Sequence, residues 1–249
     1  GHWHSSCHRE PRGPNHQLDH WDQSVSYCCM SHDNHNSIPK HYHAYRINPN
    51  YWDKEIKRLL KRIKAHNQKE NLIAFYGSST IRLWVQLPRD LSPHNVINLG
   101  FGGSSYAWCL RYFNTLFETI TPKRIIFYAG ENDLGEGLTI QQVLDNFRML
   151  VEKARYTFPK AKISVISIKP SPNRKGLSKK FMELNAMYKK YILSIEGGTY
   201  IDLYHPMLNQ VGTIRSELYL SDGLHLNRLG YKIWSNELKK FLNFQEKMN

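Results

Sequence analysis

Beyond residue 50, short apolar runs alternate with longer segments in which apolar residues recur every three or four positions. Several short runs lack polar alternation, which is typical of strands buried on both faces; the runs span residues 72–76, 96–99, 125–129, 163–168 and 200–203. The longer segments predict amphipathic helices at residues 51–66, 106–119, 140–158, 177–194 and 227–241. Because strands and helices alternate, we expect an α/β fold with helices on both faces of a mostly parallel sheet.

The first 45 residues follow neither period, and nine of the thirteen histidines lie there. Together with Cys7, Cys28 and Cys29 they offer ligands for zinc or nickel, but no Cys-x-x-Cys or His-x-x-x-His spacing defines a site. Sparse apolar residues favour an irregular or disordered extension instead. We therefore divide the chain into a His-rich extension, residues 1–45, and one domain, residues 46–249.

The chain is strongly basic, with 34 Lys and Arg against 21 Asp and Glu and a net charge of +13. Such a charge attracts nucleic acid or anionic surfaces, but the sequence contains no recognisable nucleic-acid module. We therefore interpret the excess as solvated helix faces and expect no nucleic-acid partner. No apolar run approaches the roughly 18 residues of a membrane span, so none is expected. The sequence gives no indication of the oligomeric state.

The four cysteines are Cys7, Cys28, Cys29 and Cys109. Two of them are adjacent and one stands alone in the main domain, which does not form a disulfide framework. No apolar leader is visible near residue 1. Both observations favour a cytoplasmic location.

Four polar segments rich in glycine and serine stand where ligands bind in a parallel sheet, beyond the carboxyl ends of the strands. They are residues 77–80, 100–105, 130–133 and 221–225. Each alone also fits an ordinary turn. Four of them, each placed at the end of a strand or before the last helix, favour a shared site at one edge of the sheet.

These segments supply the groups that acyl transfer requires. A serine hydroxyl such as that of Ser79 attacks only when a neighbouring base takes its proton, and an imidazole titrates near neutral pH. A carboxylate must orient that imidazole, and Asp222 and His225 are close enough in sequence for one turn to present both. Backbone N–H groups at a glycine and an Asn amide are suitable donors to the oxyanion.

With these segments in view, the chain resembles the SGNH hydrolases, also called the GDSL family of esterases and lipases, over about residues 51–243. The family's first block is similar to residues 75–84, Phe-Tyr-Gly-Ser-Ser-Thr-Ile-Arg-Leu-Trp. Its second, third and fifth blocks are similar to residues 98–104, 130–133 and 222–225. There is no Gly-x-Ser-x-Gly elbow, which argues against the unrelated α/β-hydrolases.

The resemblance implies a role for each matching residue. Ser79 is the implied nucleophile, with Asp222 and His225 completing a triad. The implied oxyanion hole consists of the N–H groups of Ser79 and Gly103 and the side-chain amide of Asn132.

The first block departs from the family's Gly-Asp-Ser pattern because Ser78 stands at the aspartate position. The Gly-Ser-Ser form followed by Ile-Arg-x-Trp resembles one branch of the family, so we do not interpret it as inactivation. Ser78 remains an alternative nucleophile, and Gly100 and Gly102 remain alternatives to Gly103.

The family's fold implies one three-layer α/β/α domain with a five-stranded parallel sheet in flavodoxin-like order. Its chemistry implies a serine esterase that acts through an acyl-enzyme. Because no long, lid-like apolar segment is evident, we expect short acyl esters, including acetyl esters. The family's chemistry implies no metal and no organic cofactor, with a small-molecule or carbohydrate ester as substrate. The alternative is a non-catalytic binding module on the same fold, which uses the basic surface for anionic polymers.

Three further features allow two interpretations each. Residues 168–172 either line the pocket or form a Pro-terminated loop. The acidic residues Glu131, Asp133 and Glu136 either face a polar substrate or cation or are ordinary loop residues. Arg82 and Trp84 support the site or only pack in the core.

Overall fold

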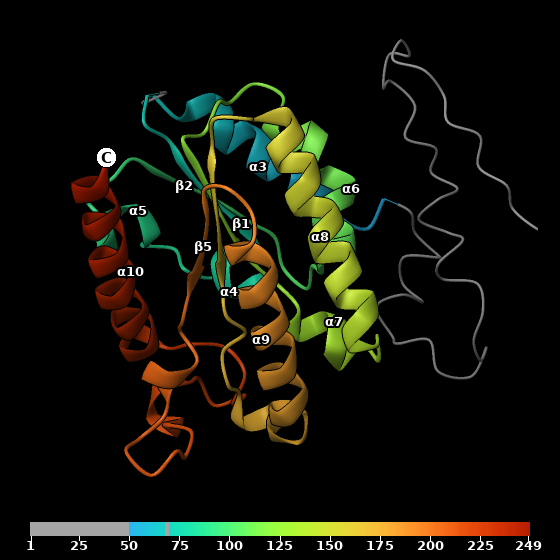
Figure 1. Ribbon diagram of the computed structural model, residues 1–249, viewed down its shortest axis with the longest axis vertical. Helices are drawn as coiled ribbons and strands as arrows, with labels where there is room; N and C mark the ends of the chain where they lie inside the picture. Colours follow the sequence, from blue (N-terminus) through green and yellow to red (C-terminus); the bar gives the residue numbers. More distant parts are fainter. Residues whose placement is uncertain (1–49, 68–69) are drawn as a thin grey trace, which may run out of the picture. The chain divides into compact units, whose positions relative to one another are not determined.

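The computed structural model describes residues 50–67 and 70–249. The predicted His-rich extension, residues 1–45, lies outside these ranges. Within them, five strands form one parallel sheet in the order β2-β1-β3-β4-β5 (Figure 1), which confirms the predicted flavodoxin-like topology. The strands are β1 Ile73–Gly77, β2 Val96–Gly100, β3 Arg124–Tyr128, β4 Lys162–Ile166 and β5 Gly198–Ile201.

Helices cover both faces of the sheet (Figure 1), as the strand and helix alternation predicts. One face carries α3 Asp53–Ala65, α6 Tyr106–Phe117, α8 Ile140–Thr157 and α9 Ser178–Leu193. The other carries α4 Ser79–Arg82, α5 Leu87–Asp90 and α10 Arg228–Met248. The described residues also form the short helix α7 Glu131–Gly135 and three 3₁₀ turns, η1 Pro172–Leu177, η2 His205–Met207 and η3 Ser216–Leu218.

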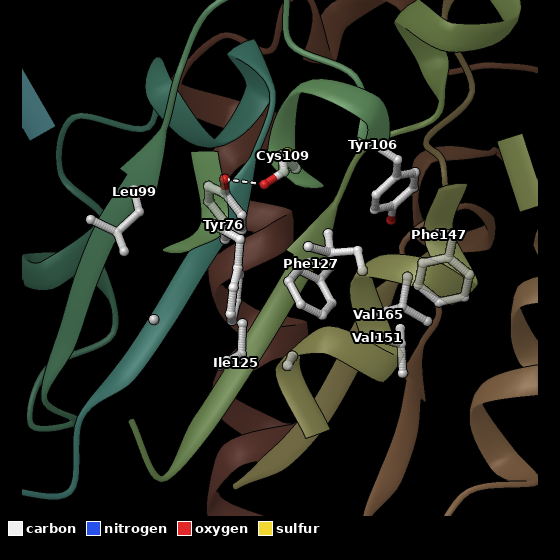
Figure 2. Packing of buried hydrophobic residues seen from close by; sticks show 14 of the residues in the cluster. Tyr76, Leu99, Tyr106, Cys109, Ile125, Phe127, Phe147, Val151 and Val165 are labelled. Carbon is white, nitrogen blue, oxygen red and sulfur yellow. Dashed lines mark hydrogen bonds between the residues drawn. The ribbon is translucent and has the colours of Figure 1, made fainter. Parts of the chain in front are cut away.

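Strand β1 shows why the apolar runs are continuous. Ala74 and Tyr76 pack into the cluster beneath α3, α6, α8 and α9, whereas Ile73 and Phe75 pack into the cluster beneath α10. Successive side chains of a strand point to opposite faces, so burial of both faces makes every position apolar. Figure 2 shows Tyr76 deep in the first cluster, where its hydroxyl donates to the backbone oxygen of Cys109 at 2.5 Å. This bond satisfies a hydroxyl that is cut off from water.

The predicted long elements match the structure apart from their ends, and the largest difference is at the C-terminal helix. We predict that helix to end near Phe241, but α10 continues to Met248. Two contacts support the extra residues: Arg124 Nη2 donates to Gln245 Oε1 at 2.9 Å, and the His94 ring lies 3.0 Å from Glu246 Oε1. Both partners come from distant segments, so helical periodicity does not reveal them. In neither described range is any helix long and apolar enough to cross a bilayer.

Candidate active site

Ser79 lies at the carboxyl edge of the sheet because β1 ends two residues before it and α4 begins at it. The turn depends on Gly77, where an added Cβ would lie 1.8 Å from the backbone oxygen of Tyr128. Only glycine allows β1 and β3 to approach so closely at this point. As the first residue of a helix, Ser79 has a backbone N–H without an intrahelical acceptor. Its hydroxyl and its N–H therefore stand at the same helix end.

A row of hydrogen bonds joins Ser79 to a histidine and a carboxylate. His225 Nε2 lies 3.3 Å from Ser79 Oγ, and His225 Nδ1 lies 2.6 Å from Asp222 Oδ2. The other carboxylate oxygen of Asp222 accepts the backbone N–H groups of Leu224 at 2.9 Å and His225 at 3.0 Å. With Nδ1–H donated to the carboxylate, Nε2 is left as an acceptor for the serine hydroxyl. The structure thus brings together the three residues implied as a triad.

The charge of Asp222 suits it to hold an imidazolium. Burial raises the pKa of its carboxyl, but hydrogen bonds from the His225 ring and from the N–H groups of His225 and Leu224 outweigh burial and lower the pKa to about 2. Asp222 is therefore ionised throughout the neutral range. An ionised partner at Nδ1 stabilises positive charge on the ring.

The neighbouring Ser78 occupies a different environment. It is the N-cap of α4, is only 3% exposed, and its backbone oxygen accepts the N–H groups of Ile81 and Arg82. The hydroxyl within hydrogen-bond distance of the His225 ring belongs to Ser79. The geometry therefore favours Ser79 over Ser78 as nucleophile.

One glycine of the second segment already uses its backbone N–H in a hydrogen bond within the protein. The N–H of Gly100 donates to Asn98 Oδ1 at 3.0 Å, so it is unavailable to a substrate. Gly103 has φ +68°, a conformation that glycine adopts without strain. The adjacent Ser104 Oγ donates to the backbone oxygen of Gly77 at 3.0 Å, which holds this loop against the end of β1. The Gly100 bond leaves Gly102 and Gly103 as candidates, and Gly103 stays the predicted oxyanion donor.

Asn132 comes from the first turn of α7 and reaches the same loop. Its Nδ2 donates to the backbone oxygen of Ser104 at 3.1 Å, and its Oδ1 accepts from Arg174 Nη2 at 3.2 Å. An amide nitrogen carries two hydrogens, so one remains for a substrate.

The acidic residues of α7 make structural contacts rather than a ligand cluster. Asp133 accepts the backbone N–H groups of Tyr106 at 3.1 Å and Gly130 at 3.0 Å, and burial raises its pKa to about 6. Glu131 faces Lys169, and Glu136 is buried. Glu131 and Asp133 are therefore residues of the loop's own architecture, whereas Glu136 follows α7 and its Oε2 has no hydrogen-bond partner among the described residues.

A second Asp-x-x-His pair, Asp202 and His205, follows β5. His205 Nδ1 lies 2.6 Å from Asp202 Oδ2, and Asp202 Oδ1 accepts the N–H groups of Tyr204 and His205, as at the first pair. The His205 side chain is 72% exposed, whereas that of His225 is 26% exposed. The sequence signal for the two pairs is the same, and only His225 is shown in contact with the serine.

Lys169 is buried beneath the loop that carries His225. Its ammonium donates to both carboxylate oxygens of Glu131, at 3.0 and 2.9 Å, to Ser171 Oγ at 2.8 Å and to the backbone oxygen of Leu224 at 2.7 Å. Burial lowers the pKa of Lys169, and the charge of Glu131 opposes this effect. The contact of Lys169 with Leu224 ties the segment after β4 to the loop that carries His225. The two interpretations of residues 168–172, a pocket wall and a Pro-terminated loop, both stay predictions.

We expect Lys169→Met to lower the free energy of unfolding by about 3–5 kcal/mol, because it leaves the buried carboxylate of Glu131 without its cation. Urea denaturation measures the loss. The matched control is Lys240→Met, which removes the partner of Glu237 from a pair in which the lysine side chain is 75% exposed. That change should cost less than about 1 kcal/mol. Equal stability of the two variants would contradict the role assigned to the buried pair.

The model of the GDSL-like lipase/acylhydrolase family matches residues 72–233, which is more than half of the chain. A search of curated proteins finds no significant match.

Several solved structures share the fold. A candidate platelet activating factor from Streptococcus pneumonia is 20% identical, with a TM-score of 0.67 over 81% of this chain and 99% of that one. A GDSL-like lipase from Bacteroides thetaiotaomicron is 22% identical, with a TM-score of 0.63 over 80% and 98%. The C-terminal domain of the Drosophila Oskar protein is 16% identical, with a TM-score of 0.58 over 68% and 87%. At these identities the likeness concerns the fold alone.

Proposed function

The chain belongs to the GDSL-like lipase/acylhydrolase family, and from this premise we propose that it is a serine esterase with Ser79 as its nucleophile. The observation that carries the proposal is the continuous row from Ser79 Oγ through the His225 ring to the Asp222 carboxylate. A weak nucleophile becomes reactive when a base within hydrogen-bond reach accepts its proton.

In the proposed first half-reaction, Ser79 Oγ attacks the ester carbonyl carbon as its proton passes to His225 Nε2. The ionised carboxylate of Asp222 stabilises the resulting imidazolium. The carbonyl electron pair moves onto oxygen, where the N–H groups of Ser79 and Gly103 and the Nδ2 of Asn132 donate to it. The intermediate collapses when His225 returns the proton to the departing alcohol, which leaves an acylated serine.

In the second half-reaction a water molecule replaces the alcohol. His225 takes a proton from the water as its oxygen attacks the acyl carbon, and the same donors hold the second oxyanion. Collapse releases the carboxylic acid and returns the proton to Ser79. Over the whole cycle the serine proton leaves with the alcohol, and a proton from water replaces it on Ser79.

We place the substrate among short acyl esters, including acetyl esters of small alcohols or carbohydrates. Two of the connections that carry the site are short: only Ser78 separates β1 from α4, and residues 129–130 separate β3 from α7. Neither connection offers a lid of apolar residues that would enclose a long acyl chain. Burial of apolar surface is the main source of affinity for such a chain.

A fluorophosphonate probe and a panel of esters test the proposal together. We expect the probe to label the protein, and p-nitrophenyl acetate to react faster than the butyrate and octanoate esters, with acetylated xylose also deacetylated. No labelling and no hydrolysis would instead favour a non-catalytic binding module. The net charge of +13, which suits an anionic polymer, is the observation that favours this alternative.

A further inference from the structure

The amide of Asn132 works as an oxyanion donor in only one of its two orientations. Rotation by half a turn exchanges its oxygen and its nitrogen, and the oxygen would repel a negative charge. In the structure Nδ2 donates to Ser104 and Oδ1 accepts from Arg174 Nη2. A guanidinium has donors and no acceptor, so it accommodates the oxygen and not the nitrogen at this place.

Arg174 reaches Asn132 because two neighbours position it. Its backbone N–H donates to the oxygen of Ser171 at 3.0 Å, and the adjacent Asn173 N–H donates to the oxygen of Gly223 at 2.9 Å, which ties η1 to the base-bearing loop. The guanidinium lies against the end of α7, where an added Cβ on Gly135 would be 2.9 Å from Arg174 Cζ. The absence of a side chain at Gly135 therefore creates the place that the guanidinium occupies.

Arg174 does not form an ordinary ion pair with the acidic residues near it. Burial and, to a smaller extent, the charge of Asp133 raise the pKa of Glu136 to about 8, although Arg174 acts in the opposite direction. Within the described ranges, Arg174 Nη1 and Glu136 Oε2 are both buried without a hydrogen-bond partner. The side-chain hydrogen bond that Arg174 makes goes to Asn132. The contact with the amide is therefore the specific interaction of this guanidinium.

We propose that Arg174 is a positioning residue of the active site, which fixes the amide of Asn132 with Nδ2 toward the oxyanion and strengthens that donor by polarising the amide. The inference rests on the proposed esterase function. A lost oxyanion donor costs about a hundredfold to a thousandfold in kcat, and a misoriented one costs part of that. The effect belongs to the transition state, so it changes kcat and not KM.

The first test compares two changes of equal charge on adjacent residues. Arg174→Gln should lower kcat for p-nitrophenyl acetate by about tenfold to a hundredfold with KM within about twofold of wild type. Lys175→Gln removes the same charge from an exposed neighbour and should leave kcat within about twofold. Equal losses in both variants would show a general charge effect and overturn the inference.

A double-mutant cycle separates action through Asn132 from a structural role. In an Asn132→Ala background, Arg174→Gln should lower kcat by less than about twofold, because the group it positions is gone. If the two losses instead multiply, Arg174 acts elsewhere and the inference fails. A wild-type protein that neither binds the fluorophosphonate nor cleaves esters would contradict the proposed function itself. This outcome is distinct from failure of the inference on Arg174.

A second variant keeps every charge and moves only the guanidinium. Gly135→Ala places a methyl group 2.9 Å from Arg174 Cζ, and the flexible end of the arginine can move away, so the fold is retained. We expect a loss in kcat similar to that of Arg174→Gln, with no further loss when both changes are combined. The matched control is Gly176→Ala, where an added Cβ meets nothing within 4 Å. Wild-type kcat in Gly135→Ala would contradict the inference.

Discussion

Ser79→Ala is expected to lower kcat for p-nitrophenyl acetate by about 10⁴-fold or more, with an unchanged unfolding midpoint. The loss follows because Ser79 Oγ is the hydroxyl that lies 3.3 Å from the base nitrogen of His225. Without it, no covalent acyl-enzyme can form at this position. Stability should persist because a half-buried hydroxyl with one long hydrogen bond contributes little to folding.

The adjacent serine supplies the matched control. Ser78→Ala makes the same chemical change one residue earlier, at a side chain that forms no capping hydrogen bond. We expect its kcat to stay within about threefold of wild type, since small changes away from the reacting atoms have small effects. Mass spectrometry of the fluorophosphonate adduct locates the modified serine in each variant. An adduct on Ser78, or full activity in Ser79→Ala, would contradict the assignment.

His225→Ala is expected to lower kcat by about 10⁴-fold or more, since removal of either the nucleophile or its base costs about as much as removal of the whole triad. The imidazole is the one group on the row that accepts the serine proton and returns it to the leaving alcohol. The measurement is single-turnover acylation by p-nitrophenyl acetate, which isolates the step that needs the base.

The second Asp-x-x-His pair provides a control of the same motif. His205→Ala removes an imidazole that is bonded to Asp202 at the same 2.6 Å as His225 to Asp222. Because the ring of His205 is largely exposed, we expect activity and stability close to wild type. Comparable losses in both variants would show that the second pair takes part in the reaction.

The fold was predictable because its main signal is local. Ile73 to Tyr76 are all buried, two on each face of the sheet, so β1 appears in the sequence as an unbroken apolar run. The helices α4, α5 and α7 have only four or five residues and cannot display a helical period, so periodicity does not reveal them. The last turns of α10 were missed because contacts from Arg124 and His94 support them.

The site divides in the same way between local and distant interactions. The sequence by itself determined that Asp222 and His225 form a pair, because a spacing of three residues lets one turn make the contacts within it. It also placed Ser79 and Asn132 just after the carboxyl ends of strands, where ligands bind in a parallel sheet.

The tertiary structure supplied the contact between this pair and the serine, across 146 positions of chain. It also showed that the N–H of Gly100 is already donated, that Lys169 bonds to the backbone oxygen of Leu224, and that Arg174 bonds to Asn132. The physical reason is that a turn's hydrogen bonds follow from the spacing of a few residues. Contacts between strand ends depend instead on the order of the strands and on what is buried between them.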